Sequence, residues 1–319
     1  MRHFVPSRCS GAAFLLLLVA CVAPQPAAGA APDRLADWRL RHQPSAQPTE
    51  HRTGPPGRGM LLAIGGGLDD DNAPVFERFL EVARGAWGKP QVVVMTAATG
   101  DQDVMAAGKF AALQTWSPNP LRCIVVKRET PTADTVAAID AATALFFTGG
   151  DQKRIVERYR PGDAETPEWQ AMQRLLLRGG VIAGSSAGLA MMGDTMLLGG
   201  TSAEALGVSE NGGGDAPAGP QIGAGMHFLP HVITDTHFFE RNRVGRLVAA
   251  LEAAGERFGI AVGEDGAVEI DIGLQTATGI AVSEALLVDT GAMTRDGDAR
   301  RGIVAVRIAR GQTVSLQQF

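Results

Sequence analysis

The stretch Val181-Ile182-Ala183-Gly184-Ser185-Ser186-Ala187-Gly188 decides the fold, because it joins a short apolar run to the pattern Gly-x-Ser-x-Gly. The first three residues predict a buried strand, and the apolar run Leu189-Ala190-Met191-Met192 predicts the helix that follows. The turn between them must lift one hydroxyl out of the sheet, and the small residues around Ser186 permit that strained backbone. Ser186 is therefore the candidate nucleophile. A purely structural strand-to-helix turn would carry the same pattern, so the rest of the chain must decide whether Ser186 is catalytic.

Upstream of this stretch, short apolar runs alternate with helical patterns. We expect strands at residues 60–64, 91–96, 123–126 and 144–148, and helices at 73–86, 101–116, 132–142 and 166–178. Short apolar strands separated by helices are typical of βαβ units, and such units build a parallel sheet that is covered on both faces. The expected fold class is therefore α/β.

Downstream of the stretch, the alternation is less regular. We expect a strand at 231–234, a helix at 239–254, and short strands at 258–262, 268–270, 279–282, 286–289 and 303–308. Turn residues separate these short strands, which indicates a β extension with antiparallel pairing near the C-terminus.

Composition excludes several classes of function. The chain has 319 residues, a net charge of -5 and 45% hydrophobic residues. A nucleic-acid-binding protein would usually carry a basic surplus, so no nucleic-acid partner is expected. Gly65-Gly66-Gly67 lacks the spaced glycines of a dinucleotide site, and no P-loop lysine follows a glycine run. No cofactor is therefore expected.

The N-terminus has the pattern of an export signal. Arg2 and Arg8 precede an apolar stretch at residues 11–23, which is too short to span a membrane. Leu18-Val19-Ala20-Cys21 resembles the lipobox of bacterial lipoproteins, which predicts a signal peptide at 1–21 and a lipid on Cys21. Ordinary cleavage after Ala28-Gly29-Ala30 is the alternative, with a signal at 1–30.

The region that follows the signal is rich in Pro, Ala, Gln and Arg. Residues 22–57 are expected to form a flexible tether, and residues 58–319 a single catalytic domain. An exported protein is expected, either secreted or periplasmic or held at a membrane by the lipid on Cys21 alone.

A serine nucleophile needs a base, and histidine is the usual one. Of the six histidines, the three outside the leader and tether are His227, His231 and His237. All three follow Ser186, which agrees with the order Ser, acid, His of nucleophile-elbow hydrolases. His237 is favoured because it lies where a strand gives way to a helix, the kind of position where doubly wound folds place their sites.

A metal site is the alternative use of these histidines. Its ligands would be His227, His231, Asp235 and His237. Their spacing matches no recognised zinc pattern, so no metal is expected.

Several motifs occur together and in order. They are Ile64-Gly65-Gly66-Gly67, Thr96-Ala97-Ala98, Phe147-Thr148-Gly149-Gly150-Asp151-Gln152, Gly184-Ser185-Ser186-Ala187-Gly188, Asp235-Thr236-His237-Phe238 with Arg241, Arg243 and Arg246, and Gly259-Ile260-Ala261-Val262-Gly263-Glu264-Asp265. With these motifs the chain resembles the cyanophycinase and aspartyl dipeptidase family of serine peptidases over residues 58–290. The resemblance implies a flavodoxin-like three-layer αβα fold related to class I glutamine amidotransferases, and a homodimer.

The resemblance also assigns catalytic roles. It matches Ser186 to the nucleophile and His237 to the base. It places the acid shortly after the elbow, where Glu204 matches best, with Glu210 and Asp194 as alternatives. Two backbone amides are expected to form the oxyanion hole: that of Ala187 from elbow geometry, and that of Gly150 from the resemblance.

The implied substrate is cyanophycin, a poly-aspartate whose side chains carry arginine, which the family cleaves to β-Asp-Arg dipeptides. Its carboxylates and guanidinium groups call for fixed cations and fixed acceptors. The candidate substrate-binding residues are Arg241, Arg243, Arg246, Asp151, Gln152, Asp235 and Thr236. On one helix, Arg243 and Arg246 would share a face that Arg241 does not, so either Arg241 precedes the helix or not all three touch substrate.

One residue departs from the family. Thr236 stands where cyanophycinases usually have glutamine, and this puts the substrate in doubt. The alternatives are a dipeptidase for small aspartyl or isoaspartyl peptides, and a non-catalytic binding protein on the same scaffold. An α/β-hydrolase esterase is disfavoured because no histidine follows His237, and because Ile64 rather than histidine directly precedes the glycine triplet Gly65-Gly66-Gly67.

Overall fold

The computed structural model describes residues 59–85, 88–207, 219–280 and 284–316. The predicted signal peptide, Cys21, the predicted tether and Glu210 lie outside the described residues. Among the helices that are described, none has the length and apolar character needed to cross a membrane.

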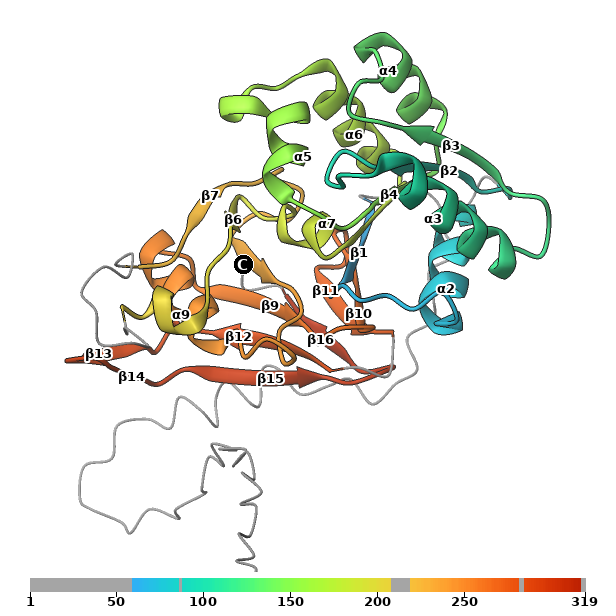
Figure 1. Ribbon diagram of the computed structural model, residues 1–319. Helices are drawn as coiled ribbons and strands as arrows, with labels where there is room; N and C mark the ends of the chain where they lie inside the picture. The colour runs from blue at the N-terminus through green and yellow to red at the C-terminus, as the bar shows by residue number, and fades with distance from the viewer. Residues whose placement is uncertain (1–58, 86–87, 208–218, 281–283, 317–319) are drawn as a thin grey trace, which may run out of the picture. The chain divides into compact units, whose positions relative to one another are not determined.

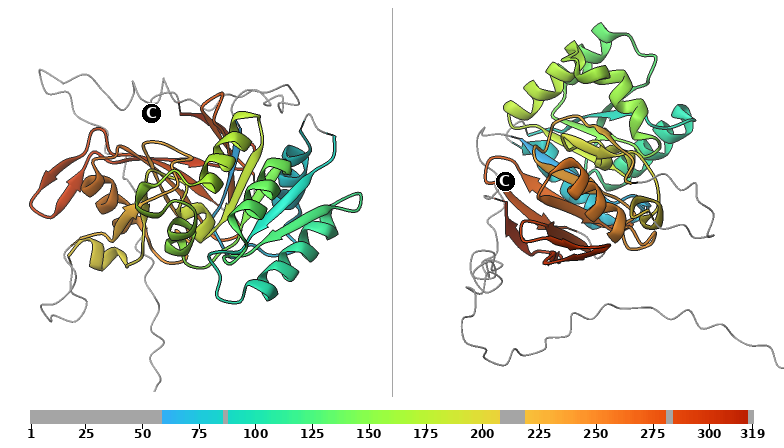
Figure 2. Two further views of the ribbon diagram at one scale, coloured as in Figure 1. Left: turned by 90° about the horizontal axis from the view of Figure 1, so that it is seen from above. Right: turned by 90° about the vertical axis from the view of Figure 1, so that its left-hand side faces the viewer.

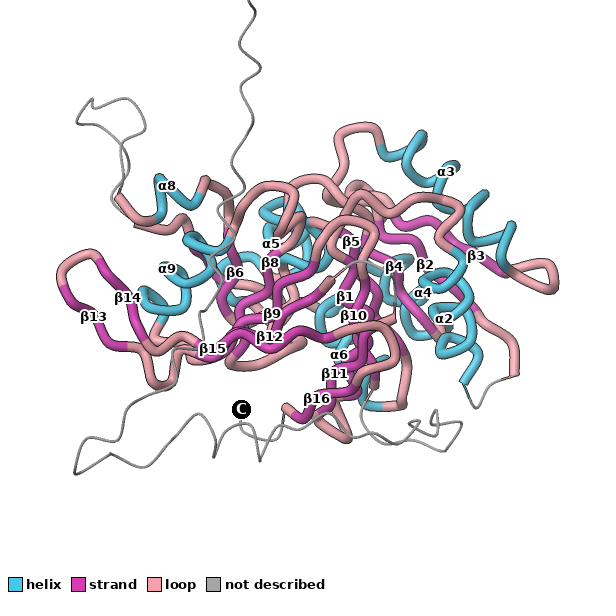
Figure 3. Tube along the Cα trace, turned by 90° about the horizontal axis from the view of Figure 1, so that it is seen from below, coloured by secondary structure: helices cyan, strands magenta, loops and turns pink. Residues whose placement is uncertain are grey.

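The main sheet has a parallel part and an antiparallel part. Its strands, in spatial order, are β16 (Thr313–Ser315), β11 (Thr276–Gly279), β10 (Ala267–Asp271), β1 (Met60–Ile64), β5 (Val181–Ser185), β4 (Ala144–Phe147), β2 (Gln91–Met95) and β3 (Arg122–Val126). Strands β1, β5, β4, β2 and β3 are parallel to one another, whereas β10, β11 and β16 are antiparallel to their neighbours. Strand β5, which leads to Ser186, therefore lies in the middle of the sheet, between β1 and β4 (Figure 3).

Helices cover both faces of this sheet, as Figures 1 and 2 show. They are α2 (Ala73–Arg84), α3 (Gln102–Trp116), α4 (Thr132–Ala141), α5 (Gln152–Tyr159), α6 (Pro167–Leu177) and the short α7 (Ala187–Ala190), with a 3-10 turn at Pro161–Asp163. Because side chains alternate along a strand, Leu61 and Ala63 of β1 enter one core, whereas Leu62 and Ile64 enter the other. The first core contains α4 to α7 and the second contains α2 and α3. The fold is the flavodoxin-like α/β fold that the sequence predicts.

Helix α2 shows how local sequence sets such an element. The side chain of Asn72 accepts a hydrogen bond from the backbone N–H of Val75 at 3.2 Å, which caps the first turn. Apolar residues then recur at helical spacing, and Val75, Phe76 and Phe79 are fully buried.

The predicted β extension is divided between two sheets. Two of its strands, β10 and β11, extend the main sheet together with β16, a strand that the sequence did not predict. A second sheet has the order β15 (Val304–Ile308), β12 (Ala285–Asp289), β9 (Phe258–Val262) and β8 (Val232–Asp235) (Figure 3). Within it, β8 and β9 are parallel. Helix α9 (Val244–Ala254) packs on one face of this sheet, and the other face joins the core of the main sheet.

The remaining elements are short. They are α8 (Ser202–Ala205) and the strand pairs β6 (Thr195–Leu197) with β7 (Ile222–Ala224), and β13 (Thr294–Asp296) with β14 (Ala299–Arg301).

Several elements differ from the sequence prediction, and three of the differences are instructive. Helix α5 was not predicted, because its mostly polar sequence buries only Ile155, Val156 and Tyr159. Helix α9 begins at Val244 rather than at residue 239, because turns that include Asn242 with a positive φ of 49° fill the interval. The strand expected at 279–282 ends at Gly279 instead, and residues 281–283 lie outside the described part.

Candidate active site

Ser186 lies in a sharp turn between β5 and α7. Its φ of 53° and ψ of -109° are unusual for a residue other than glycine. The small neighbours are required by space: a Cβ on Gly184 would overlap the carbonyl of Gly188, and a Cβ on Gly188 would lie 2.7 Å from the carbonyl oxygen of Phe147. Ser185, in contrast, is the buried last residue of β5. The turn thus sets Ser186 apart from the strand that leads to it.

The second sheet supplies two partners for Ser186. Because β8 and β9 are parallel neighbours, their carboxyl ends lie at the same edge, and His237 and Glu264 each follow one of these ends. The Nε2 of His237 lies 2.8 Å from the Oγ of Ser186, and its Nδ1 lies 2.5 Å from the Oε1 of Glu264. With the proton on Nδ1, the ring donates to the carboxylate and can accept the serine proton at Nε2.

The acid therefore differs from the one expected, because Glu264 and not Glu204 contacts His237. Glu204 caps its own helix: its Oε2 accepts from the backbone N–H of Thr201 at 2.6 Å, and its N–H donates to the Thr201 hydroxyl. The alternative Asp194 contacts His227 and His231 instead. The chain order is Ser, His, Glu, so the assumption that the acid precedes the histidine was wrong. The available signal was a carboxylate two residues after the end of the predicted strand 258–262.

The glycine triplet at residues 65–67 provides the surface against which these side chains lie. The backbone N–H of His237 donates to the carbonyl of Gly65 at 2.8 Å. A Cβ on Gly66, whose φ is +100°, would overlap the imidazole of His237, and a Cβ on Gly67 would lie 3.1 Å from Glu264. The sequence alone predicted no role in the site for this triplet. Its role is to let the main chain approach the imidazole and carboxylate.

Of the two residues expected to form the oxyanion hole, Ala187 directly follows Ser186, and Gly150 directly follows a glycine that packs against Ser186. Ala187 is the first residue of α7, and Gly149 is so close to Ser186 that its Cβ, if present, would lie 3.4 Å from the Cβ of Ser186. Gly150, with φ of +140°, packs where a side chain would overlap the carbonyl of Ala98. Neither the Ala187 nor the Gly150 amide donates to a protein group in the described part of the chain. No protein acceptor among the described residues therefore competes with an oxyanion for these amides.

Comparison with known proteins adds the family to this geometry. The model of peptidase family S51 matches residues 61–274. The chain belongs to peptidase family S51. It is a serine-type peptidase.

Curated relatives and a solved structure agree with this assignment. A cyanophycinase from Geminocystis herdmanii is 30% identical over 214 residues, which cover 65% of this chain and 72% of that protein. A cyanophycinase from a Nostoc species is 28% identical over 229 residues, covering 70% and 71%. The fold is similar to that of a peptidase from an acI-B1 actinobacterium, with a TM-score of 0.57 and 17% identity over 81% of this chain and 97% of that one.

The candidate substrate-binding residues of this S51 peptidase fall into two groups. Asp235 is buried and forms a two-pronged ion pair with Arg246, whose Nε lies 2.9 Å from Oδ2. Arg243 donates to the carbonyl and the hydroxyl of Thr236, at 2.7 and 3.1 Å. These four residues are therefore committed to one another and support the segment that carries His237.

The other candidates remain available. Arg241 precedes α9, which agrees with the first of the two alternatives drawn from the helical spacing of the arginines. Its side chain is 54% exposed, and its Nη2 lies 4.0 Å from the Oε1 of Glu264. Gln152 donates through Nε2 to the carbonyl of Leu197 at 2.6 Å, which leaves its Oε1 as an acceptor. Asp151 caps α5 by accepting from the N–H of Lys153. One exposed cation and two acceptors thus remain for a substrate.

The four residues of the alternative metal site do not come together as ligands. His237 contacts Ser186 and Glu264, Asp235 is paired with Arg246, and neither lies with His227 or His231 in a ligand cluster among the described residues.

The environment of His237 favours the neutral imidazole. Burial is the largest influence and lowers its pKa below the usual 6.5; the hydrogen bond from Nδ1 to Glu264 raises the pKa, and the charge of Arg241 lowers it. A general base must be neutral to accept the serine proton. The acid limb of the peptidase's kcat/KM profile is therefore expected below pH 6.5.

Replacing Arg241 tests this electrostatic effect. In Arg241→Gln the cation that disfavours imidazolium is gone, so the pKa of His237 is expected to rise and the acid limb to move to higher pH. The measurement is kcat/KM against pH, and the control is Arg301→Gln, which removes an exposed cation from β14. An acid limb that moves equally in both variants, or toward lower pH in Arg241→Gln, would contradict the expected effect of the Arg241 charge on the pKa of His237.

Gly66→Ala tests the close approach of the main chain to His237. The new methyl would overlap the imidazole and the residue would keep a left-handed φ, so we expect about 2 kcal/mol of lost stability and at least a tenfold loss of kcat. Gly88→Ala is the matched control, since Gly88 also has a positive φ of 75° but a Cβ at this position would have no other atom within 4 Å. The loss in free energy of unfolding of Gly88→Ala gives the cost of the backbone conformation alone. Equal losses of kcat in the two variants would exclude a special role for Gly66.

Proposed function

We propose that this S51 peptidase is an exopeptidase of the cyanophycinase type, which cleaves cyanophycin to β-Asp-Arg through an acyl-enzyme on Ser186. The observation that carries the proposal is the hydrogen-bonded series Ser186, His237 and Glu264, with the exposed guanidinium of Arg241 beside it. The curated relatives that are named cyanophycinase support the substrate class.

The proposed reaction begins at the hydroxyl of Ser186. Its Oγ attacks a backbone carbonyl between two aspartyl residues, while Nε2 of His237 accepts the proton and the Glu264 carboxylate stabilises the imidazolium. The amides of Ala187 and Gly150 bind the oxyanion, each worth about 3 kcal/mol in the transition state. His237 then protonates the leaving amine, and water releases the acyl group by the same steps in reverse.

Recognition of the substrate follows from the groups left available. Arg241 binds a carboxylate of the β-Asp-Arg unit, and the oxygens of Asp151 and Gln152 accept hydrogen bonds from its guanidinium. Arg243, Arg246, Asp235 and Thr236 act indirectly, by holding the segment between β8 and α9 in place.

A dipeptidase that acts on small aspartyl or isoaspartyl peptides is the second candidate. Thr236 favours it, because this short side chain is buried and accepts from Arg243, and so offers a polymer no contact of the kind a glutamine can make.

The test is digestion of an insoluble cyanophycin suspension by the full chain, with identification of the soluble products by mass. Release of β-Asp-Arg by the wild type and not by Ser186→Ala is the expected result. Hydrolysis of small aspartyl dipeptides without release from the polymer would instead select the dipeptidase.

We also propose that the protein is exported, held at the membrane by a lipid on Cys21, and dimeric. The support for export is the N-terminal sequence pattern. Cells that express the full chain are expected to carry it in the membrane fraction, and Cys21→Ser is expected to move it to the soluble fraction. An unchanged distribution would contradict the lipid anchor, and the mass of the detergent-solubilised protein tests the dimer.

A further inference from the structure

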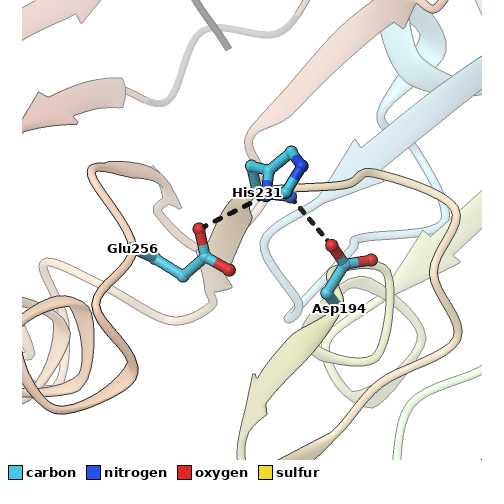
Figure 4. Close-up of side chains that lie close together, drawn as sticks. All are labelled: Asp194, His231 and Glu256. Atoms are coloured by element: carbon cyan, nitrogen blue, oxygen red, sulfur yellow. Dashed lines mark hydrogen bonds and ion pairs between the residues drawn. The ribbon is translucent and has the colours of Figure 1, made fainter.

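A second cluster of histidine and carboxylate side chains lies apart from Ser186, His237 and Glu264. Asp194, His231 and Glu256 each present a ligand atom, and these atoms lie within 4.8 Å of one another. Figure 4 shows the imidazole with one carboxylate on either side. The Nδ1 of His231 is 3.8 Å from the Oε2 of Glu256. Three segments that are distant in sequence thus converge on one point.

Neighbouring groups hold Asp194 in place. The Nδ1 of His227 lies 3.1 Å from its Oδ1, and the backbone N–H of His231 donates to its Oδ2 at 3.1 Å. A carboxylate has about four lone-pair sites, so two remain for a further ligand. Hydrogen-bonded support of this kind is typical of carboxylates that bind metals.

The loop that carries both histidines has an unusual backbone. His227 has a φ of 55° and His231 a φ of 60°, a conformation that few residues other than glycine adopt. Phe228 and Leu229, between them, are buried and tie the loop to the core. This loop presents the imidazole of His227 to Asp194 and that of His231 to Glu256.

In the described part of the chain, no arginine or lysine pairs with the carboxylates of the cluster. Among the described residues, none lies within 4.0 Å of Asp194 or Glu256, whose neighbours are the imidazoles of His227 and His231 instead. The carboxylate of Asp235, in contrast, is paired with Arg246. A bound cation would supply the missing positive charge.

We propose that Asp194, His231 and Glu256 bind a divalent transition-metal ion of the zinc type, with His227 orienting Asp194. One imidazole and two carboxylates suit zinc, and three protein ligands leave a fourth position for water. Zinc ligands lie about 2.0–2.1 Å from the metal, so tetrahedral ligand atoms are about 3.4 Å apart. The side chain of His231 is 70% exposed, so it is free to rotate and close the remaining gap.

The position of the cluster gives the metal a structural role. His231 directly precedes β8, and Glu256 lies two residues before β9. The opposite ends of the same parallel strands lead to His237 and Glu264, and the four-residue strand β8 that separates the two sites is itself about 13 Å long at about 3.3 Å per residue. The metal fastens the amino ends of the strand pair whose register places the base beside its acid. It does not take part in the hydrolysis.

Zinc content is the first test. The full chain is dialysed against ZnCl₂, then against metal-free buffer, and its zinc is measured. The wild type is expected to retain about one zinc more per chain than His231→Ala or Glu256→Gln. His42 and His51 are present in every sample and supply the same background. Glu165→Gln, which removes an exposed carboxylate elsewhere, is the matched control and should retain the wild-type content. Equal zinc in all four proteins would overturn the proposal.

Thermal unfolding is the second test, and it does not depend on peptidase activity. At a hundred-fold excess of zinc over its Kd, the Tm of the wild type is expected to rise by about 5 °C or more. His231→Ala should unfold near the wild-type Tm in EDTA, because its side chain is exposed, but should show no rise with zinc. A rise of equal size in His231→Ala would contradict the site even if zinc binds elsewhere.

Discussion

Ser186→Ala is expected to lower kcat for peptide hydrolysis by about 10⁶-fold, the size of loss that follows removal of a serine nucleophile. The hydroxyl is the group that would form the acyl bond, and the 2.8 Å contact with His237 cannot be replaced by a methyl group. The measurement is single-turnover hydrolysis of an aspartyl peptide. A variant with more than about a thousandth of the wild-type rate would show that another group, or water, attacks the substrate.

Ser186→Gly separates the chemistry from the strain at the elbow. Glycine adopts the φ of 53° and ψ of -109° without the cost that serine incurs, so the variant should be inactive yet more stable by about 1 kcal/mol. Urea unfolding gives the difference. Ser185→Gly is the control, because Ser185 has ordinary strand backbone and glycine there should destabilise the protein. A loss of stability in both variants would mean that the elbow stores no strain.

Glu264→Gln is expected to lower kcat by about 10²–10⁴-fold. The amide removes the negative charge that stabilises imidazolium and can hold His237 in the wrong tautomer, as the equivalent change does in serine proteases. Because the side chain keeps its size beside Gly67, KM and the free energy of unfolding should change little. Steady-state kinetics and thermal unfolding measure both.

Glu204→Gln is the matched comparison. Glutamine also completes a capping box with Thr201, so neither kcat nor stability should change by more than a small factor. If Glu204→Gln lost activity and Glu264→Gln kept it, the acid would be the one expected from sequence, and the contact between Glu264 and His237 would be unrelated to catalysis.

Local sequence determined much of this protein. The alternation of apolar runs and helical patterns predicted the parallel sheet and most of its helices, because burial of one helix face or a whole strand imposes a period that a short window reveals. The pattern around Ser186 predicted the elbow for a similar reason, since only small residues fit there. The position of His237 after a predicted strand was also correctly read as an edge of a sheet.

Tertiary structure alone decided which carboxylate meets His237 and which arginine is exposed. Glu264, Glu204 and Asp194 have the same chemistry, and their distances along the chain do not distinguish them. The choice follows from the pairing of β8 with β9, a contact between distant segments that brings two strand ends to one edge. Arg246 and Arg241 differ in the same way: one is buried against Asp235 and the other faces solvent, because burial is set by packing and not by residue type.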